Sequence, residues 1–300
     1  MKKSRKTAIV ISVILLIGIY YYVTLPAINI HSTDTWFYIA GLIVFILVFY
    51  IIRKRMRPTE IRESKPAKAM LTVLLAVGVV YLIGSILSSP IVNAKKYQKL
   101  LKVEKGNFTE DVEEVSFDRV PLLDKDTAEI LGDRKMGSMV DMVSQFEADD
   151  IYTQINYKER PVRVTPLKYA SFIKWITNQS EGIPAYIRID MASQNTELVK
   201  LDQGIKYSTS EYLNRNIYRH LRFRYPTAIF DELSFEIDDK GVPYWVAPVK
   251  KFNIGLFGGE TVGSVVLCNA VTGECKSYKI EDVPQWVDRA YSADLLVELF

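Results

Sequence analysis

Three long stretches without a charged residue constrain this chain more than any other feature. Residues 8–25, 36–52 and 69–87 are mostly apolar and contain no Asp, Glu, Lys, Arg or His. Each is close to the ~20 residues that a helix needs to cross ~30 Å of hydrocarbon, and none shows the polar face of a soluble core helix. The sequence therefore predicts three membrane-spanning helices within residues 1–89. Because transport pathways usually need ionisable groups at membrane depth, we interpret these helices as an anchor.

Basic residues are concentrated in the segments that flank these stretches. Residues 1–6 carry four Lys or Arg, and residues 53–68 carry seven against two acids, whereas the loop 26–34 carries none. Positively charged loops stay in the cytoplasm. The pattern predicts a multi-pass plasma-membrane protein whose N-terminus is cytoplasmic and whose C-terminal domain is extracytoplasmic.

The rest of the chain is acidic. Residues 91–300 contain 27 Lys and Arg against 32 Asp and Glu, although the whole sequence has 38 against 35. Nucleic-acid binding requires basic charge gathered on the folded domain. We therefore expect the lipid bilayer and an extracytoplasmic or membrane protein as partners, and no nucleic acid.

Residues 90–150 are predicted to be a connector with lead-in helices. Beyond residue 150, apolar and polar residues alternate along several segments, as is typical of β-strands. PVRVTPLK at 161–168 matches PYWVAPVK at 243–250, and residues 183–201 match residues 262–280. A repeated strand pattern with a helix beside each copy indicates one supersecondary unit present twice.

The predicted fold class is therefore α+β. It comprises three transmembrane helices followed by two tandem modules, each a small antiparallel sheet with a helix. We place the first module at residues 151–230 and the second at residues 231–300.

A short motif in the second module carries a family resemblance. Residues 265–274 read VVLCNAVTGE, which is a strand followed by a turn of the type D/N-x-x-T-G-E. This arrangement resembles the PepSY-like modules. The first copy keeps Asp190 but has Ser-Gln-Asn at 193–195 where the motif has Thr-Gly-Glu. The resemblance implies non-catalytic extracytoplasmic modules, as found in propeptides that restrain peptidases and in membrane-anchored partners of Gram-positive cell-wall hydrolases.

The two cysteines, Cys268 and Cys275, lie symmetrically about this turn. A hairpin with a four-residue loop would pair Asn269 with Glu274 and bring the cysteines within bonding range. Outside the cytoplasm a disulfide would persist, and the alternative is two reduced, half-buried cysteines. Two cysteines with no histidine nearby in the sequence do not indicate a zinc site. We expect no metal and no cofactor.

A predicted helix over residues 210–225 supplies the candidate binding residues. Arg215, Arg219 and Arg222 would form a basic ridge on one face, able to meet an anionic lipid, an anionic wall polymer or an acidic partner. The ridge could equally pair with the domain's own acids. Trp245 is either a core residue or, if a surface cleft exposes it, a residue that binds glycan or peptide.

No catalytic motif occurs, and His220 has no carboxylate near it in the sequence. Several acids near predicted turns could support carboxylate catalysis: Asp149, Asp150, Asp231, Glu232, Glu236, Asp238 and Asp239. We expect a membrane-anchored extracytoplasmic binding or regulatory protein that modulates a peptidase or cell-wall hydrolase. The alternatives are a carboxylate-based hydrolase acting on cell-surface polymer and an accessory subunit of a membrane complex.

Overall fold

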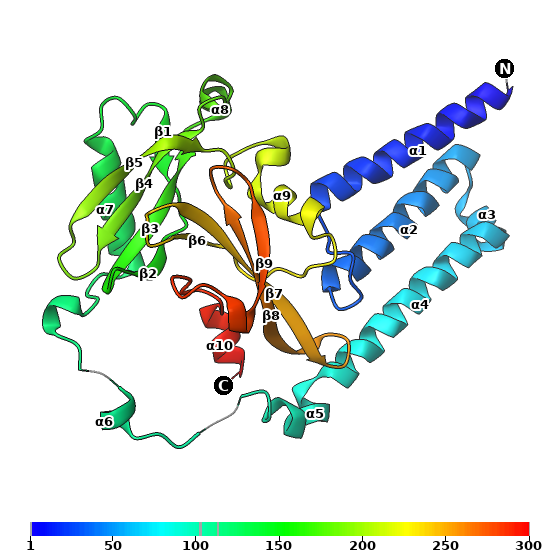
Figure 1. The fold of residues 1–300 in the computed structure, drawn as a ribbon. Coiled ribbons are helices and arrows are strands. Elements are labelled where there is room, and N and C mark those ends of the chain that lie inside the picture. The colour runs from blue at the N-terminus through cyan, green and yellow to red at the C-terminus, as the bar shows by residue number, and fades with distance from the viewer. Residues whose placement is uncertain (1, 102–103, 113, 300) are drawn as a thin grey trace. The chain divides into compact units, whose positions relative to one another are not determined.

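The computed structural model describes residues 2–101, 104–112 and 114–299 (Figure 1). The chain divides into two compact units. The first consists of the described residues of Met1–Leu101, Tyr225–Ile229 and Lys251–Thr261. The second consists of those of Lys102–Arg224, Phe230–Lys250 and Val262–Phe300. The fold is a mixture of α-helices and antiparallel sheets.

Helices make up most of the first unit. They are α1 (Lys2–Thr24), α2 (Thr33–Lys54), α3 (Pro58–Glu63), α4 (Lys65–Ser88) and α5 (Pro90–Tyr97). Among the described residues, α2 and α4 are long and apolar enough to cross a membrane, whereas the apolar part of α1, Ile11–Thr24, is shorter. The side chains of residues 1–10, where the predicted first span begins, lie outside the described part.

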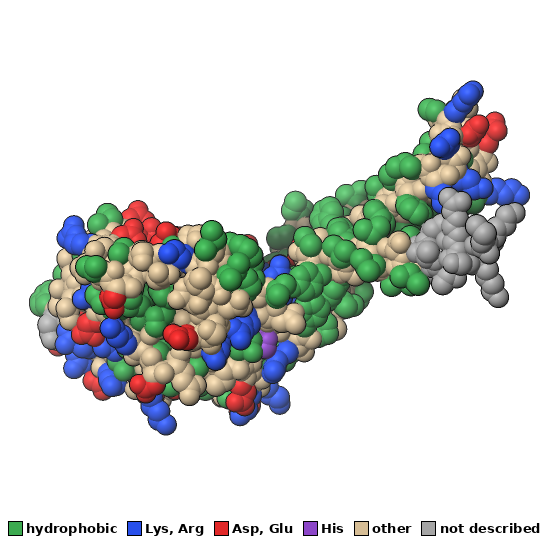
Figure 2. Space-filling view, turned by 90° about the horizontal axis from the view of Figure 1, so that it is seen from above, with side chains coloured by type: hydrophobic (Ala, Val, Ile, Leu, Met, Phe, Trp, Pro, Cys, Tyr) green, Lys and Arg blue, Asp and Glu red, His purple; other side chains and the backbone are tan. Residues whose placement is uncertain are grey.

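Many apolar side chains of α2 and α4 are exposed. Phe37 in α2 is 65% exposed, and Leu75 in α4 is 69% exposed. Figure 2 shows hydrophobic side chains gathered along these helices. Exposed apolar surface of this extent marks an interaction with lipid or with another protein.

A hairpin tip from far along the chain packs against the helices within the first unit. Strands β7 (Pro243–Ile254) and β8 (Gly258–Asn269) meet at this tip. The hydroxyl of Ser88 accepts the N–H groups of Leu256 and Phe257 at 2.9 and 3.0 Å, and it donates to Gly84 O at 2.7 Å. A Cβ on Gly84 would lie 2.7 Å from Leu256 Cδ1, so the side chain of Leu256 would have to shift to accommodate any larger residue.

Aromatic contacts reinforce this packing. The ring of Phe257 lies 6.3 Å from that of Trp36 and 5.2 Å from that of Tyr81. His31 stacks on Phe252 at 5.6 Å. The tip therefore contacts residues near the start of α2 and near the end of α4, which places those two helix ends together.

The second unit contains a five-stranded sheet. Its strands are β1 (Phe146–Ala148), β2 (Thr153–Tyr157), β3 (Arg160–Tyr169), β4 (Ile183–Asp190) and β5 (Thr196–Ile205). The order is β1–β3–β4–β5, with β2 also pairing β3, and every pair is antiparallel. Helix α7 (Lys125–Gly137) contacts β1, β4 and β5, and α8 (Phe172–Asn178) connects β3 to β4. Short α6 (Phe108–Asp111) precedes them.

A four-stranded sheet follows, in the order β6–β7–β8–β9. Strands β6 (Ser234–Ile237) and β9 (Cys275–Lys279) lie at its edges, and β7 and β8 contribute residues to both units. Val246, Val265 and Leu267 form a core with Leu295 of α10 (Ala293–Leu299).

The two sheets make the same hydrogen bonds at equivalent positions. In the first sheet the N–H of Met191 donates to Pro161 O, and in the second the N–H of Ala270 donates to Pro243 O, both at 2.9 Å. The directly opposed pair Ile189–Thr196 of β4 and β5 corresponds to Cys268–Cys275 of β8 and β9, each 79 residues later. The local backbone geometry of the two hairpins is therefore the same.

The predicted helix over residues 210–225 begins later than expected. Helix α9 spans Ile217–Arg224, and Leu213–Arg215 form a separate 3₁₀ turn. The side chain of Asn216 accepts the N–H of Arg219 at 3.4 Å and so caps the start of α9. Ile217 and Leu221 of α9 are buried, whereas Leu213 of the 3₁₀ turn is 64% exposed.

Candidate functional site at the disulfide hairpin

The turn between β8 and β9 is built by its own side chains. Asn269 Oδ1 accepts the N–H groups of Val271 and Thr272, both at 2.9 Å. Gly273 has a φ of +72°, and a Cβ there would collide with the ring of Tyr207. The position therefore requires glycine both for its backbone conformation and for the approach of the tyrosine.

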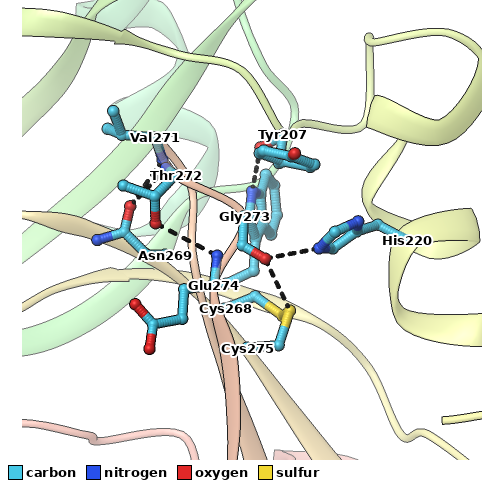
Figure 3. Close-up of a disulfide and its surroundings, with 10 residues drawn as sticks. Tyr207, His220, Cys268, Asn269, Val271, Thr272, Gly273, Glu274 and Cys275 are labelled. Atoms are coloured by element: carbon cyan, nitrogen blue, oxygen red, sulfur yellow. Dashed lines mark hydrogen bonds between the residues drawn. A yellow bond between two sulfur atoms is a disulfide. The ribbon is translucent and has the colours of Figure 1, made fainter. Parts of the chain in front are cut away.

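Cys268 and Cys275 lie directly opposite each other beyond this turn, with their Cα atoms 4.0 Å apart. The structure joins them by a disulfide (Figure 3). Cys268 is fully buried, whereas Cys275 is half-buried. Their pairing follows from the backbone bond between Asn269 N–H and Glu274 O, which sets the register of the two strands.

His220 of α9 reaches the same turn. Its Nε2 lies 2.7 Å from Gly273 O, and its ring lies 4.4 Å from the ring of Tyr207 (Figure 3). Burial lowers the pKa of His220, and nearby Arg224 lowers it further, while the bond to Gly273 acts in the opposite direction. A neutral imidazole that donates its Nε2 proton to Gly273 O fits this environment.

A ring nitrogen of His220 and the sulfur atoms of Cys268 and Cys275 all lie within 4.8 Å of one another. A metal site was not expected because no histidine is near the cysteines in the sequence. The tertiary structure brings one there from 48 residues away. No local pattern could have indicated this, since α9 and the hairpin meet only in the folded unit.

Trp245 lies beneath this site and not at a surface cleft. Its side chain is fully buried, its Nε1–H donates to Tyr207 O at 2.8 Å, and its ring lies 5.4 Å from that of Phe235. This placement argues against direct ligand binding by Trp245. Its indole instead holds the backbone of Tyr207, whose ring packs on His220.

The three arginines do not share one helix face. Arg215 precedes α9, and its Nη1 donates to Gln179 O at 2.5 Å. Arg219 and Arg222 lie on α9, and the guanidinium of Arg222 sits 5.6 Å from the ring centre of Phe230. All three side chains are half-buried. The predicted continuous ridge is interrupted because Asn216 starts the helix after Arg215.

Six of the seven acids considered for catalysis have structural partners, and the seventh, Asp239, is exposed. Glu236 is fully buried and accepts the N–H groups of Asp288 and Arg289 at 2.9 and 3.1 Å. Burial raises its pKa to about 7. The other contacts are Asp231 with Ser292 and Lys250, Asp149 with Thr209, Asp150 with Lys168, Glu232 with Arg289, and Asp238 with the turn at Lys240 and Val242.

One groove of about 820 Å³ opens elsewhere on the second unit. Arg119, Glu159, Asp288 and Arg289 bring charges of both signs to its wall, and Leu296 adds an apolar part. Arg119 and Glu159 pair at 3.4 Å. A groove with mixed charge and exposed walls suits a peptide or protein surface better than an enclosed small molecule.

No protein-family model, curated protein or solved structure matches this chain. The resemblance of residues 265–274 to PepSY-like modules therefore stays a prediction from the sequence.

Proposed function

We propose that this protein is anchored in the plasma membrane by α1, α2 and α4 and that its second unit lies outside the cytoplasm. There it binds and regulates another protein, a peptidase or cell-wall hydrolase. The observation that carries the proposal is the pair of exposed apolar helices, α2 and α4. Seven basic residues lie at their facing ends and in the connection between them, within residues 53–68.

The basic segment supports the orientation. Residues 53–68 comprise the end of α2, the connection that contains α3 and the start of α4, and positively charged loops remain cytoplasmic. The opposite helix ends are those that the hairpin tip contacts through Trp36 and Ser88. Aromatic residues such as Trp36 and Tyr81 favour the membrane–water interface. A disulfide between Cys268 and Cys275 fits an oxidising compartment.

The contacts of the acids favour binding over hydrolysis. A general acid has to reach the substrate, yet Glu236 is enclosed by backbone donors. Asp231 and Asp149 are likewise held by hydroxyl groups. The mixed-charge groove offers a surface for a protein partner, and the resemblance to PepSY-like modules suggests the class of that partner.

Cysteine labelling in intact cells tests the orientation. Lys105→Cys lies after the helices, and Glu63→Cys lies in the basic segment between them. A membrane-impermeant maleimide should label the first variant in intact cells and the second only after lysis. Labelling of Glu63→Cys alone in intact cells would contradict the proposal.

Photo-crosslinking tests the binding role. A crosslinking amino acid replaces Gln154 or Tyr291 at the groove, with Glu197 on β5 as the matched control position. The groove positions should capture a peptidase or wall hydrolase, and purified full-length protein should change that enzyme's rate. An unchanged rate for every captured enzyme would refute the regulatory role.

A further inference from the structure

We propose that the hairpin binds one Zn²⁺-like cation through Cys268, Cys275 and His220 once its disulfide is reduced. The redox state of the two cysteines then controls cation binding, because their sulfur atoms become metal ligands only as thiolates. This inference concerns the second unit alone and does not depend on the partner proposed above.

The three ligands come from β8, β9 and α9, and their donor atoms already lie within 4.8 Å of one another. Tetrahedral Zn²⁺ takes sulfur at ~2.3 Å and nitrogen at ~2.0 Å, which separates its ligands by roughly 3.5 Å. On reduction the two sulfurs, which are bonded in the disulfide, have to move apart to about this separation. The ring nitrogen of His220 has to approach them by about 1 Å, which side-chain rotations can supply. Two sulfurs and one nitrogen are ligands that Zn²⁺ prefers.

The backbone holds the two cysteines opposite each other without the disulfide. The Asn269 N–H bond to Glu274 O and the side-chain bonds of Asn269 close the turn independently of the sulfurs. After reduction the thiols therefore remain side by side. Cys275 and His220 are half-buried, so the cation can enter and a water can take the fourth position.

A hairpin of this geometry forms without residues equivalent to Cys268, Cys275 and His220. The equivalent turn after β4 uses Asp190 Oδ1 to accept the N–H groups of Ala192 and Ser193, as Asn269 does in the second copy. Its opposed pair is Ile189 and Thr196, with no cysteine. Structural packing accounts for His220 through its bond to Gly273 O and its ring contact with Tyr207, whereas ligation accounts for the histidine and both cysteines together.

A dithiol reductant can reduce the Cys268–Cys275 disulfide. Its two thiols join in a disulfide, and the Cys268–Cys275 bond breaks as each sulfur receives one electron and one proton. The cation then displaces both thiol protons to solvent. As His220 releases Gly273 O, its ring proton passes from Nε2 to Nδ1 through solvent, and Nε2 then donates its lone pair to the cation.

Cobalt binding to tag-free, full-length protein in detergent tests the proposal. After reduction and removal of the reductant under anaerobic conditions, Co²⁺ should produce thiolate charge-transfer absorption and the visible bands of a tetrahedral site, with one ion per chain. Zn²⁺ should displace it. Oxidised protein should show neither signal.

Variants distinguish this site from adventitious binding. His220→Ala should weaken binding by tenfold or more, while the other histidine, changed in His31→Ala, should bind as the parent does. Cys275→Ser should lose the charge-transfer band. Circular dichroism shows whether the reduced protein stays folded, and unfolding on reduction would refute the proposal. Equal binding by His220→Ala and the parent, or no band in folded reduced protein, would also overturn it.

Discussion

Nε2 of His220 lies 2.7 Å from the carbonyl oxygen of Gly273, which joins α9 to the turn of the disulfide hairpin. The contact links residues 53 positions apart. It depends on Gly273 lacking a Cβ, because the ring of Tyr207 occupies that space. Helix α9 therefore supports the turn through the polar contact of His220 with Gly273 O and the packing of its ring on Tyr207.

Removing this contact should weaken the folded state. His220→Ala loses a hydrogen bond to a carbonyl, so we expect the free energy of unfolding to fall by about 1 kcal/mol. Burial lowers the pKa of His220 below 6.5, so its contribution is present above pH 6.5 and is lost as the pH falls through the folded value. Urea denaturation of parent and variant should therefore converge at acid pH. A difference that grows on acidification would contradict this reading.

A second disulfide should form in the first hairpin. Ile189→Cys with Thr196→Cys places cysteines at the positions that correspond to Cys268 and Cys275, in the same register. We expect spontaneous oxidation and a gain of about 2 kcal/mol in the free energy of unfolding. Non-reducing mass spectrometry measures the bond. The control pairs Ile189→Cys with Glu197→Cys, which is one residue out of register and should stay reduced.

The hairpin tip should loosen when Ser88 loses its hydroxyl. Ser88→Ala leaves the N–H groups of Leu256 and Phe257 without their acceptor, at a cost of about 1–3 kcal/mol. Hydrogen exchange over residues 251–261 should accelerate. Ser85→Ala is the matched control, because that hydroxyl donates only to Tyr81 O within α4. Equal exchange in the two variants would show that the Ser88 hydroxyl does not hold the tip.

Glu236 should make the second unit less stable as the pH rises. Burial raises its pKa to about 7 from 4.5, so its stabilisation is present below pH 4.5 and is lost as the pH rises through 7. Compared with Glu236→Gln, the parent should lose on the order of 3 kcal/mol across this range. Thermal unfolding at several pH values measures the difference between the two proteins. A constant difference would mean that the carboxyl titrates normally.

Local information predicted a substantial part of the fold. Alternation of apolar residues indicated the strands, and the repeat of PVRVTPLK as PYWVAPVK indicated β3 and β7. The symmetric positions of Cys268 and Cys275 on either side of a short turn indicated that they lie directly opposite each other on β8 and β9. These features depend on neighbours within about ten residues, where side-chain periodicity and turn chemistry dominate.

By itself the sequence determined the apolar helices α2 and α4, the antiparallel hairpins and the register of the cysteines. Only the tertiary structure decided that Trp245 is buried, that His220 meets the disulfide and that the 251–261 tip packs on Ser88. The physical reason is the separation along the chain of the residues that interact. Periodicity and turn residues act along the chain, whereas these contacts join segments 38 to 168 residues apart, whose meeting depends on how whole elements bury their apolar faces.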